Sequence, residues 1–138
     1  MIVNRTLEIK TQGNTDIINI TPDIERSLST AGIRQGAVTV FSAHTTCSVT
    51  IMEYEPGLIA DFKKAWERIV PRDIPYEHDK RWGDGNGYSH VRASMLGFSV
   101  TIPFTDSQMV LGTWQQVVLV DFDVRPRERR IILQFSGE

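Results

Sequence analysis

The stretch WQQVVLVDFDVRPRERRIILQF, residues 114–135, decides the fold. It predicts two strands, Trp114–Phe122 and Arg129–Phe135, joined by a turn at Arg125-Pro126-Arg127. The first strand is apolar through Val117–Val120 and alternates after that, which is typical of a central strand with one solvent-exposed end. A connection this short makes the two strands antiparallel neighbours.

Working outward from this stretch, the remaining chain predicts six more strands and two main helices. The strands are expected at Ile2–Lys10, Asp16–Ile20, Ala37–Phe41, Thr46–Met52, Phe98–Phe104 and Met109–Gly112. Thr21 is expected to cap a helix that has Pro22 at its first position and ends near Ala31. The clearest helix is Leu58–Val70, whose apolar residues recur at helical spacing and place Trp66 in the core. We therefore predict the α+β class, with mostly antiparallel sheets, in a single domain spanning residues 1–138.

Composition excludes several classes of protein. The net charge is −2, which gives no electrostatic basis for binding nucleic acid or an acidic membrane. The longest apolar runs are only a few residues, and the N-terminus alternates like a strand, so neither a membrane span nor a signal peptide is expected. Cys47 is the lone cysteine, which fits a reducing, cytoplasmic location.

All three histidines fall in two short segments that are also rich in carboxylates and hydroxyls. The first is HTTCSVTIMEYEPG, His44–Gly57, and the second is YEHDKRWGDGNGYSH, Tyr76–His90. The region 71–89 shows no periodicity and is expected to be an irregular connection. Its three glycines alternate with Asp84 and Asn86, a pattern that suits either a plain turn or a backbone that approaches a ligand closely.

A metal site is the first chemistry that these segments suggest. Three imidazoles, from His44, His78 and His90, could hold zinc with one position open, and Asp84 or Glu53 could lie nearby. Asp79 and Glu55 offer further carboxylates. The spacing matches no linear metal motif such as HExxH, so the prediction rests on residue types.

Two other chemistries remain open. Cys47 could be a nucleophile, although a small buried strand residue is the commoner role of such a cysteine. A phosphate site is suggested by hydroxyls, the glycine-rich loop and arginines, namely Thr45, Thr46, Ser48, Arg81 and Arg92. Neither common nucleotide-binding fingerprint is present.

Several segments together resemble the YjbQ-like family, also called the secondary thiamine-phosphate synthase family. They are HTTCSVTIMEYEPG, YEHDKRWGDGNGYSHVRASMLG, TIPF, LGTWQQVVLVDFD and RPRERRIILQFSGE. The resemblance runs from about Val40 to Glu138. It implies an α+β domain that assembles as a homotrimer, with sheets packed around a threefold axis and a pocket near the subunit interface.

The resemblance also implies roles for individual residues. His44, Thr45 and Thr46 match the family's HTT segment, His78 and His90 its two later histidines, and Glu53 its glutamate after the strand. Thr113, Trp114 and Gln115 match the GTWQ segment. Many members carry a shorter asparagine- or aspartate-rich stretch where this chain has GDGNGYS, and often an NE pair where it has Met52-Glu53.

Taken with the composition, the resemblance implies a small cytoplasmic trimeric enzyme of the secondary thiamine-phosphate synthase type. It would use a divalent metal, zinc or magnesium, held by His44, His78 and His90, with His90 or Glu53 carrying the proton. A phosphorylated or anionic small molecule would contact Thr45, Thr46, Ser48, Asp84, Asn86, Arg92, Trp114 and Gln115. The alternative is an accessory protein that binds a metal or small ligand without turnover. A purely structural zinc site is disfavoured, because such sites are often built from several cysteines.

Overall fold

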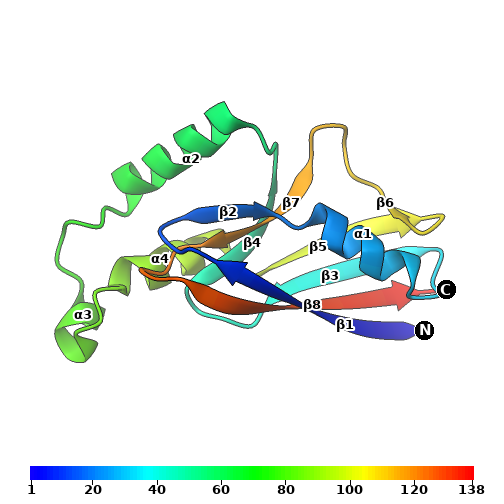
Figure 1. The fold of residues 1–138 in the computed structure, drawn as a ribbon, viewed down its shortest axis with the longest axis horizontal. Coiled ribbons are helices and arrows are strands. Elements are labelled where there is room, and N and C mark those ends of the chain that lie inside the picture. The colour runs from blue at the N-terminus through cyan, green and yellow to red at the C-terminus, as the bar shows by residue number, and fades with distance from the viewer.

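The computed structural model describes residues 1–138 as eight strands and four helices (Figure 1). The strands are β1 (Ile2–Thr11), β2 (Asp16–Asn19), β3 (Gly36–Ser42), β4 (Cys47–Met52), β5 (Ser99–Thr105), β6 (Gln108–Met109), β7 (Gln116–Asp121) and β8 (Arg127–Gly137). The helices are α1 (Thr21–Ser29), α2 (Pro56–Ile69), α3 (Glu77–Trp82) and α4 (Gly87–Leu96). Each predicted strand is present within a few residues, and the α+β class is confirmed.

The strands form two antiparallel sheets. One has five strands in the order β1-β8-β3-β5-β6, and the other has three in the order β2-β7-β4. The sheets pack face to face, because Val40 of β3 and Leu133 of β8 share one buried cluster with Leu119 of β7. The turn after β7 therefore carries the chain from one sheet to the other, so β7 and β8 are not the paired neighbours that the sequence predicted.

Strand β7 is buried on both faces, which explains its unbroken apolar run. Val117 and Leu119 face the five-stranded sheet, whereas Val118 and Val120 face a second cluster that includes Trp66 of α2 and residues of α4. The predicted solvent-exposed end of this strand is wrong, because Asp121 is fully buried. The inner apolar residues of β7 and β8 are used by the chain's own core and leave little apolar surface for a neighbouring subunit.

The helical predictions need three corrections. Thr21 does not cap α1 with its side chain, since its hydroxyl accepts a hydrogen bond from Val117 N at 2.8 Å. The region 71–89 is not wholly irregular, because it contains α3 and the first turn of α4. Four helices are present rather than two main ones, although α1 and α2 lie where they were expected.

Helix α2 lies at the upper left of Figure 1 and packs its apolar face against the second cluster. It begins where the Glu55 carboxylate accepts hydrogen bonds from Gly57 N and Leu58 N at 2.8 and 2.7 Å. Trp66 anchors it, being 7% exposed and packed edge-on against Phe122, which confirms its predicted core role. No helix is both long and apolar enough to cross a bilayer.

Candidate functional site

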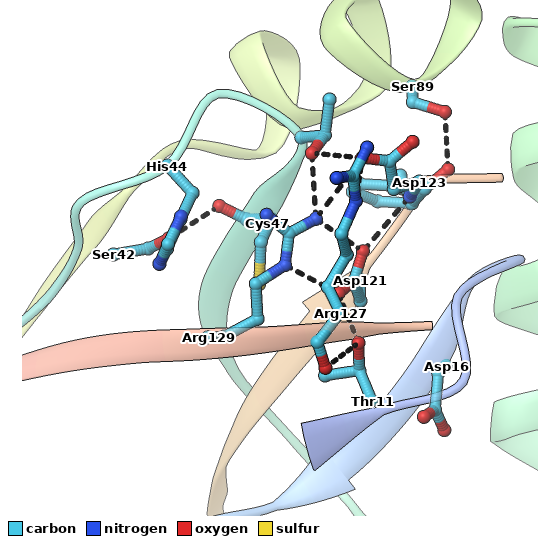
Figure 2. A network of polar contacts seen from close by, with 12 residues as sticks. Thr11, Asp16, Ser42, His44, Cys47, Ser89, Asp121, Asp123, Arg127 and Arg129 are labelled. Atoms are coloured by element: carbon cyan, nitrogen blue, oxygen red, sulfur yellow. Dashed lines mark hydrogen bonds and ion pairs between the residues drawn. The ribbon is translucent and has the colours of Figure 1, made fainter. Parts of the chain in front are cut away.

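A buried charge network lies at the point where the chain leaves β7 (Figure 2). Arg129 donates to both carboxylate oxygens of Asp121, at 2.6 and 2.8 Å, and Thr11 Oγ1 donates to Asp121 Oδ2 at 2.5 Å. Both members of the Arg129–Asp121 pair are almost fully buried. A bidentate pair with its remaining lone pairs satisfied is the arrangement that a buried ion pair needs.

Asp123 extends this network to the surface. Its carboxylate accepts hydrogen bonds from Thr46 Oγ1 at 3.0 Å, Asn86 Nδ2 at 3.2 Å and Arg127 Nε at 2.9 Å. Burial alone would raise the pKa of Asp123, but hydrogen bonds from Val124 N and these side chains hold it below its usual value. Asp123 is therefore a fixed anion that ties β8 and the N-terminus of α4 together.

A polar pocket of about 370 Å³ opens above this network. Its lining residues come from the β3–β4 connection, the start of α4 and the β7–β8 turn: Ala43, His44, Thr45, Thr46, Asn86, His90, Asp123, Arg127 and Arg129. Five predicted site residues from two separate segments of the chain thus meet in one cavity: His44, Thr45, Thr46, Asn86 and His90. The side-chain oxygen of Asn86, Oδ1, is buried and has no hydrogen-bond partner.

His44 has one ring nitrogen committed. Its Nε2 accepts a hydrogen bond from Arg130 N at 2.8 Å, so the neutral ring carries its proton on Nδ1. Burial and the nearby Arg129 guanidinium lower the pKa of His44, which favours the neutral ring. In this state neither nitrogen has a free lone pair for a metal, and His44 is suited to donate a hydrogen bond instead.

The two other histidines lie against each other, and the short helix α3 positions one of them. Gly83 ends α3 in the left-handed conformation, at φ 71°, and Asp79 then accepts a hydrogen bond from Gly87 N at 2.7 Å. This places His78 beside His90, with ring centroids 4.4 Å apart. Burial, followed by the proximity of His78, lowers the pKa of His90.

A cluster of possible metal ligands surrounds His78. One donor atom from each of His78, Asp79 and Asp84 lies within 4.8 Å of the others. His78 Nδ1 is 3.4 Å from Asp84 Oδ1, is buried, and has no hydrogen-bond partner. This cluster holds one of the three predicted histidine ligands together with two aspartates, while His44 lies in the polar pocket.

Two predicted ligand residues are buried away from the polar pocket. The Arg92 guanidinium donates to Val70 O and Glu67 and lies over the Tyr88 ring. Its side chain is only 2% exposed, so it serves the packing of α4 against α2 and not a ligand. The Ser48 hydroxyl donates to Ala93 O at 3.0 Å and is likewise buried.

The Glu53 and GTWQ positions form a different surface. Glu53 and Trp114 line a separate pocket beside Tyr54 and Pro56, which shares no residue with the one that holds His44 and His90. Gln115 is exposed and accepts a hydrogen bond from Gly112 N at 2.8 Å. The prediction that Glu53 shares one site with His90 is therefore corrected by the fold.

Cys47 lies inside the core between the two sheets. Burial raises the pKa of its thiol to about 12, so the thiolate needed for nucleophilic attack is scarce near neutral pH. The structure favours the structural role that the sequence suggested over the nucleophilic one.

Asp121, Asp123, Arg127 and Arg129 were missed as site residues. The two acids are spaced by two residues, as are the two arginines, so each pair projects from one side of an extended chain. That repeated spacing on both sides of the turn was the signal available in the sequence. Local pattern alone indicates a solvent-exposed strand end followed by a turn, because nothing in the neighbouring sequence shows that these charged residues are buried.

Comparison with known proteins gives a consistent result across the chain. The family model described as "UPF0047 protein YjbQ-like" matches residues 5–138. A UPF0047 protein of Archaeoglobus fulgidus is 38% identical over 93% of this chain and 97% of its own, and YugU of Bacillus subtilis is 34% identical over 96% and 98%. The solved structure of APE1520 from Aeropyrum pernix superimposes with a TM-score of 0.91 at 30% identity, covering 99% of both chains. That of SSO2532 from Sulfolobus solfataricus, described as a protein of unknown function, gives 0.90 at 26% identity over 100% of both.

Proposed function

Because the chain belongs to the YjbQ-like UPF0047 family, we propose that it is an enzyme acting on a phosphorylated small molecule in the pocket between His44 and His90. The reaction type is the transfer ascribed to the secondary thiamine-phosphate synthase family, in which a phosphate-bearing ring is joined to a second ring and pyrophosphate leaves. The observation that carries the proposal is the meeting of two histidines, two threonine hydroxyls and two arginines around one cavity.

The donors in this pocket suit phosphate oxygens. Thr45 presents a hydroxyl, and Arg127 presents the guanidinium N–H groups that its contact with Asp123 leaves free. His44 presents an N–H that is fixed by the hydrogen bond on its other nitrogen. Charge-assisted hydrogen bonds of this kind are the strong ones for phosphate. Thr46 and Arg129 are already engaged with the buried aspartates and hold the pocket floor in place.

A neighbouring slot suits the rest of such a substrate. Phe41 and Phe98 line a pocket of about 340 Å³ that shares Ala43, His44 and Thr45 with the polar pocket. A molecule with a phosphate at one end and a flat ring at the other could therefore place the phosphate in the polar pocket and the ring in the pocket lined by Phe41 and Phe98. Aromatic side chains supply the apolar contact area that a ring requires.

His90 is the group best placed to carry a proton. It lines the polar pocket, and its lowered pKa favours the neutral ring, whose free nitrogen can accept a proton. Glu53 has no part in this proposal because it lies in the separate pocket.

A divalent ion fits the cluster of His78, Asp79 and Asp84. The fit rests on the buried Nδ1 of His78, which has no partner, and on two carboxylates beside it. Zinc would use all three donors, and magnesium would favour the aspartates. Such an ion would supply positive charge against phosphate oxygens next to His90.

The family resemblance also supports assembly as a homotrimer, in the cytoplasm. Sedimentation equilibrium at micromolar concentration should then give three times the 15.7 kDa mass of one chain. A monomer mass would remove this part of the proposal.

The test of the activity compares two variants in protein purified from a host that lacks its own thiamine-phosphate synthase. His90→Asn should lower thiamine-phosphate formation by about a hundredfold or more, the usual contribution of one acid/base group. Glu53→Gln is the matched control and should keep the wild-type rate, because Glu53 lies outside the pocket. Equal trace rates in all three proteins would favour the accessory, non-catalytic alternative.

A further inference from the structure

A second pocket, of about 410 Å³, lies between α2 and the turn that joins β1 to β2. Its lining consists only of polar and charged residues: Asn14, Thr15, Lys63, Lys64, Glu67, Arg68 and Arg72. Four of the seven are cations and one is an anion, whereas the whole chain is acidic at −2. It shares no residue with the pocket of His44 and His90.

Three of these cations have no counter-ion. Lys63, Lys64 and Arg68 are exposed on α2, and none of them makes an ion pair within the chain. Lys64 and Arg68 are one helical turn apart, a spacing at which like charges repel. Positive charges that gather around a hollow and have no carboxylate partner attract an anion.

The single acid in this pocket does not neutralise them. Glu67 Oε1 forms an ion pair with Arg72, whose Nε lies 2.8 Å away, and accepts a hydrogen bond from the buried Arg92 Nη2 at 3.1 Å. Its charge is therefore matched by two guanidiniums, one of which belongs to the packing of α4. Lys63, Lys64 and Arg68 are left facing the cavity with their charges unbalanced.

The wall opposite α2 is held rigidly in place. Gly13 has φ +81°, and a Cβ there would lie 2.6 Å from Arg125 O. Asn14 N donates to Asp123 O at 2.6 Å, and Thr15 Oγ1 accepts from Arg92 Nη1 at 3.2 Å. Because three successive residues of this wall are held in place, the pocket is formed before a ligand binds. A preformed pocket lowers the entropy cost of binding.

We propose that this second pocket is a binding site for a multivalent phosphate anion of the pyrophosphate or oligophosphate class. Three unpaired cations call for more than one negative charge, and ammonium and guanidinium groups bind phosphate oxygens strongly. The site is separate from the proposed catalytic pocket because the two share no lining residue. Asp123 lies between them: its main-chain carbonyl accepts a hydrogen bond from Asn14 N, and its carboxylate lines the other pocket.

Calorimetric titration with inorganic pyrophosphate, in metal-free buffer of low ionic strength, tests the site. The variant Lys63→Ala/Lys64→Ala/Arg68→Ala should bind at least about tenfold more weakly at this site, because three charge-assisted contacts are lost. The matched control is Arg5→Ala/Arg26→Ala/Arg34→Ala, which removes the same charge from exposed positions that line no pocket. It should bind within twofold of wild type. Added salt should weaken binding to the wild type.

Backbone amide shifts identify where the anion binds. Pyrophosphate should shift Asn14 and residues 63–68 in the wild type and in an Arg127→Ala variant that weakens the other pocket. The proposal is overturned if the wild type shows no saturable binding, or if the triple variant on α2 binds as the wild type does. Shifts confined to the surroundings of His44 and His90 overturn it as well, and leave the proposed function standing.

Discussion

His78 of α3 and His90 of α4 lie with their ring centroids 4.4 Å apart and their planes inclined by 39°. Two positively charged rings at this separation would repel each other strongly. Burial, and then the neighbouring His78, accordingly lower the pKa of His90. The pair therefore links His90, the proposed proton carrier, to the cluster of possible metal ligands.

The first prediction concerns this link. In metal-free protein, His78→Asn should raise the pKa of His90 toward its ordinary value of 6.5 without reaching it, because burial remains. NMR titration of the ring protons measures the change, with His44 as an internal reference whose pKa should stay in place. An unchanged pKa of His90 would contradict the coupling.

The same shift predicts how stability depends on pH. A histidine whose pKa is lowered on folding binds fewer protons in the native than in the unfolded state, so stability falls as pH drops below about 6.5. His78→Asn should make the contribution of His90 to this fall smaller. Urea unfolding at a series of pH values between 7 and 5 measures it.

The second prediction distinguishes two metal sites. Asp84→Asn should weaken binding of zinc or cobalt, since it removes one of three clustered donors, whereas His44→Ala should not, because His44 is engaged with Arg130 N. Asp61→Asn, on the exposed surface of α2, is the matched control for the loss of one carboxylate. If the His44→Ala variant loses metal and the Asp84→Asn variant keeps it, the metal site is the predicted one of three histidines and not the cluster around His78.

The third prediction compares two arginine–aspartate pairs with the same 2.6 Å contact. Arg129→Met leaves Asp121 buried without its partner and should lower the free energy of unfolding by about 3–5 kcal/mol. Arg34→Met breaks the exposed pair with Asp106 and should cost less than about 1 kcal/mol. Urea denaturation of both variants measures the difference, and similar losses would mean that burial of the Arg129 network has little energetic weight.

These pairs also show why some of the site was predictable and some was not. Strands such as β8 alternate in hydrophobicity because one face meets the core, so their existence follows from local pattern. His44 and His90 stood out because of their residue type. The burial of Asp121 does not follow from local pattern, since it depends on Arg129 reaching across from the other sheet.

The short helix α3 was unpredictable for a related reason. Its six residues, EHDKRW, have no apolar stripe, and no residue in it is buried. It is placed by its ends, with Gly83 in the left-handed conformation and Asp79 bound to Gly87 N. The glycines that suggested an irregular loop are therefore the residues that end one helix and begin the next.

The fourth prediction concerns Cys47. Its thiol should not react with a disulfide reagent in the folded protein near pH 8, because burial raises its pKa to about 12. Cys47→Ala should keep any activity while lowering stability, because it leaves a small cavity between the sheets. Fast labelling of the native protein, or loss of activity with the fold and metal content intact, would return Cys47 to consideration as a nucleophile.

The last prediction compares two glycines with nearly the same backbone conformation. Gly13 has φ +81° and Gly32 has φ +74°, so alanine at either position carries the cost of the left-handed region, about 1–2 kcal/mol. A Cβ at Gly32 meets nothing within 4 Å, whereas one at Gly13 would lie 2.6 Å from Arg125 O and 2.8 Å from Asp123 O. Gly13→Ala must therefore also push the turn away from the β7–β8 connection, which adds about 1–3 kcal/mol of overpacking. Urea unfolding should show that the free energy of unfolding falls more in Gly13→Ala than in Gly32→Ala, by that margin. Equal losses would show that the turn can move away from the Asp123–Arg125 backbone without destabilising the protein.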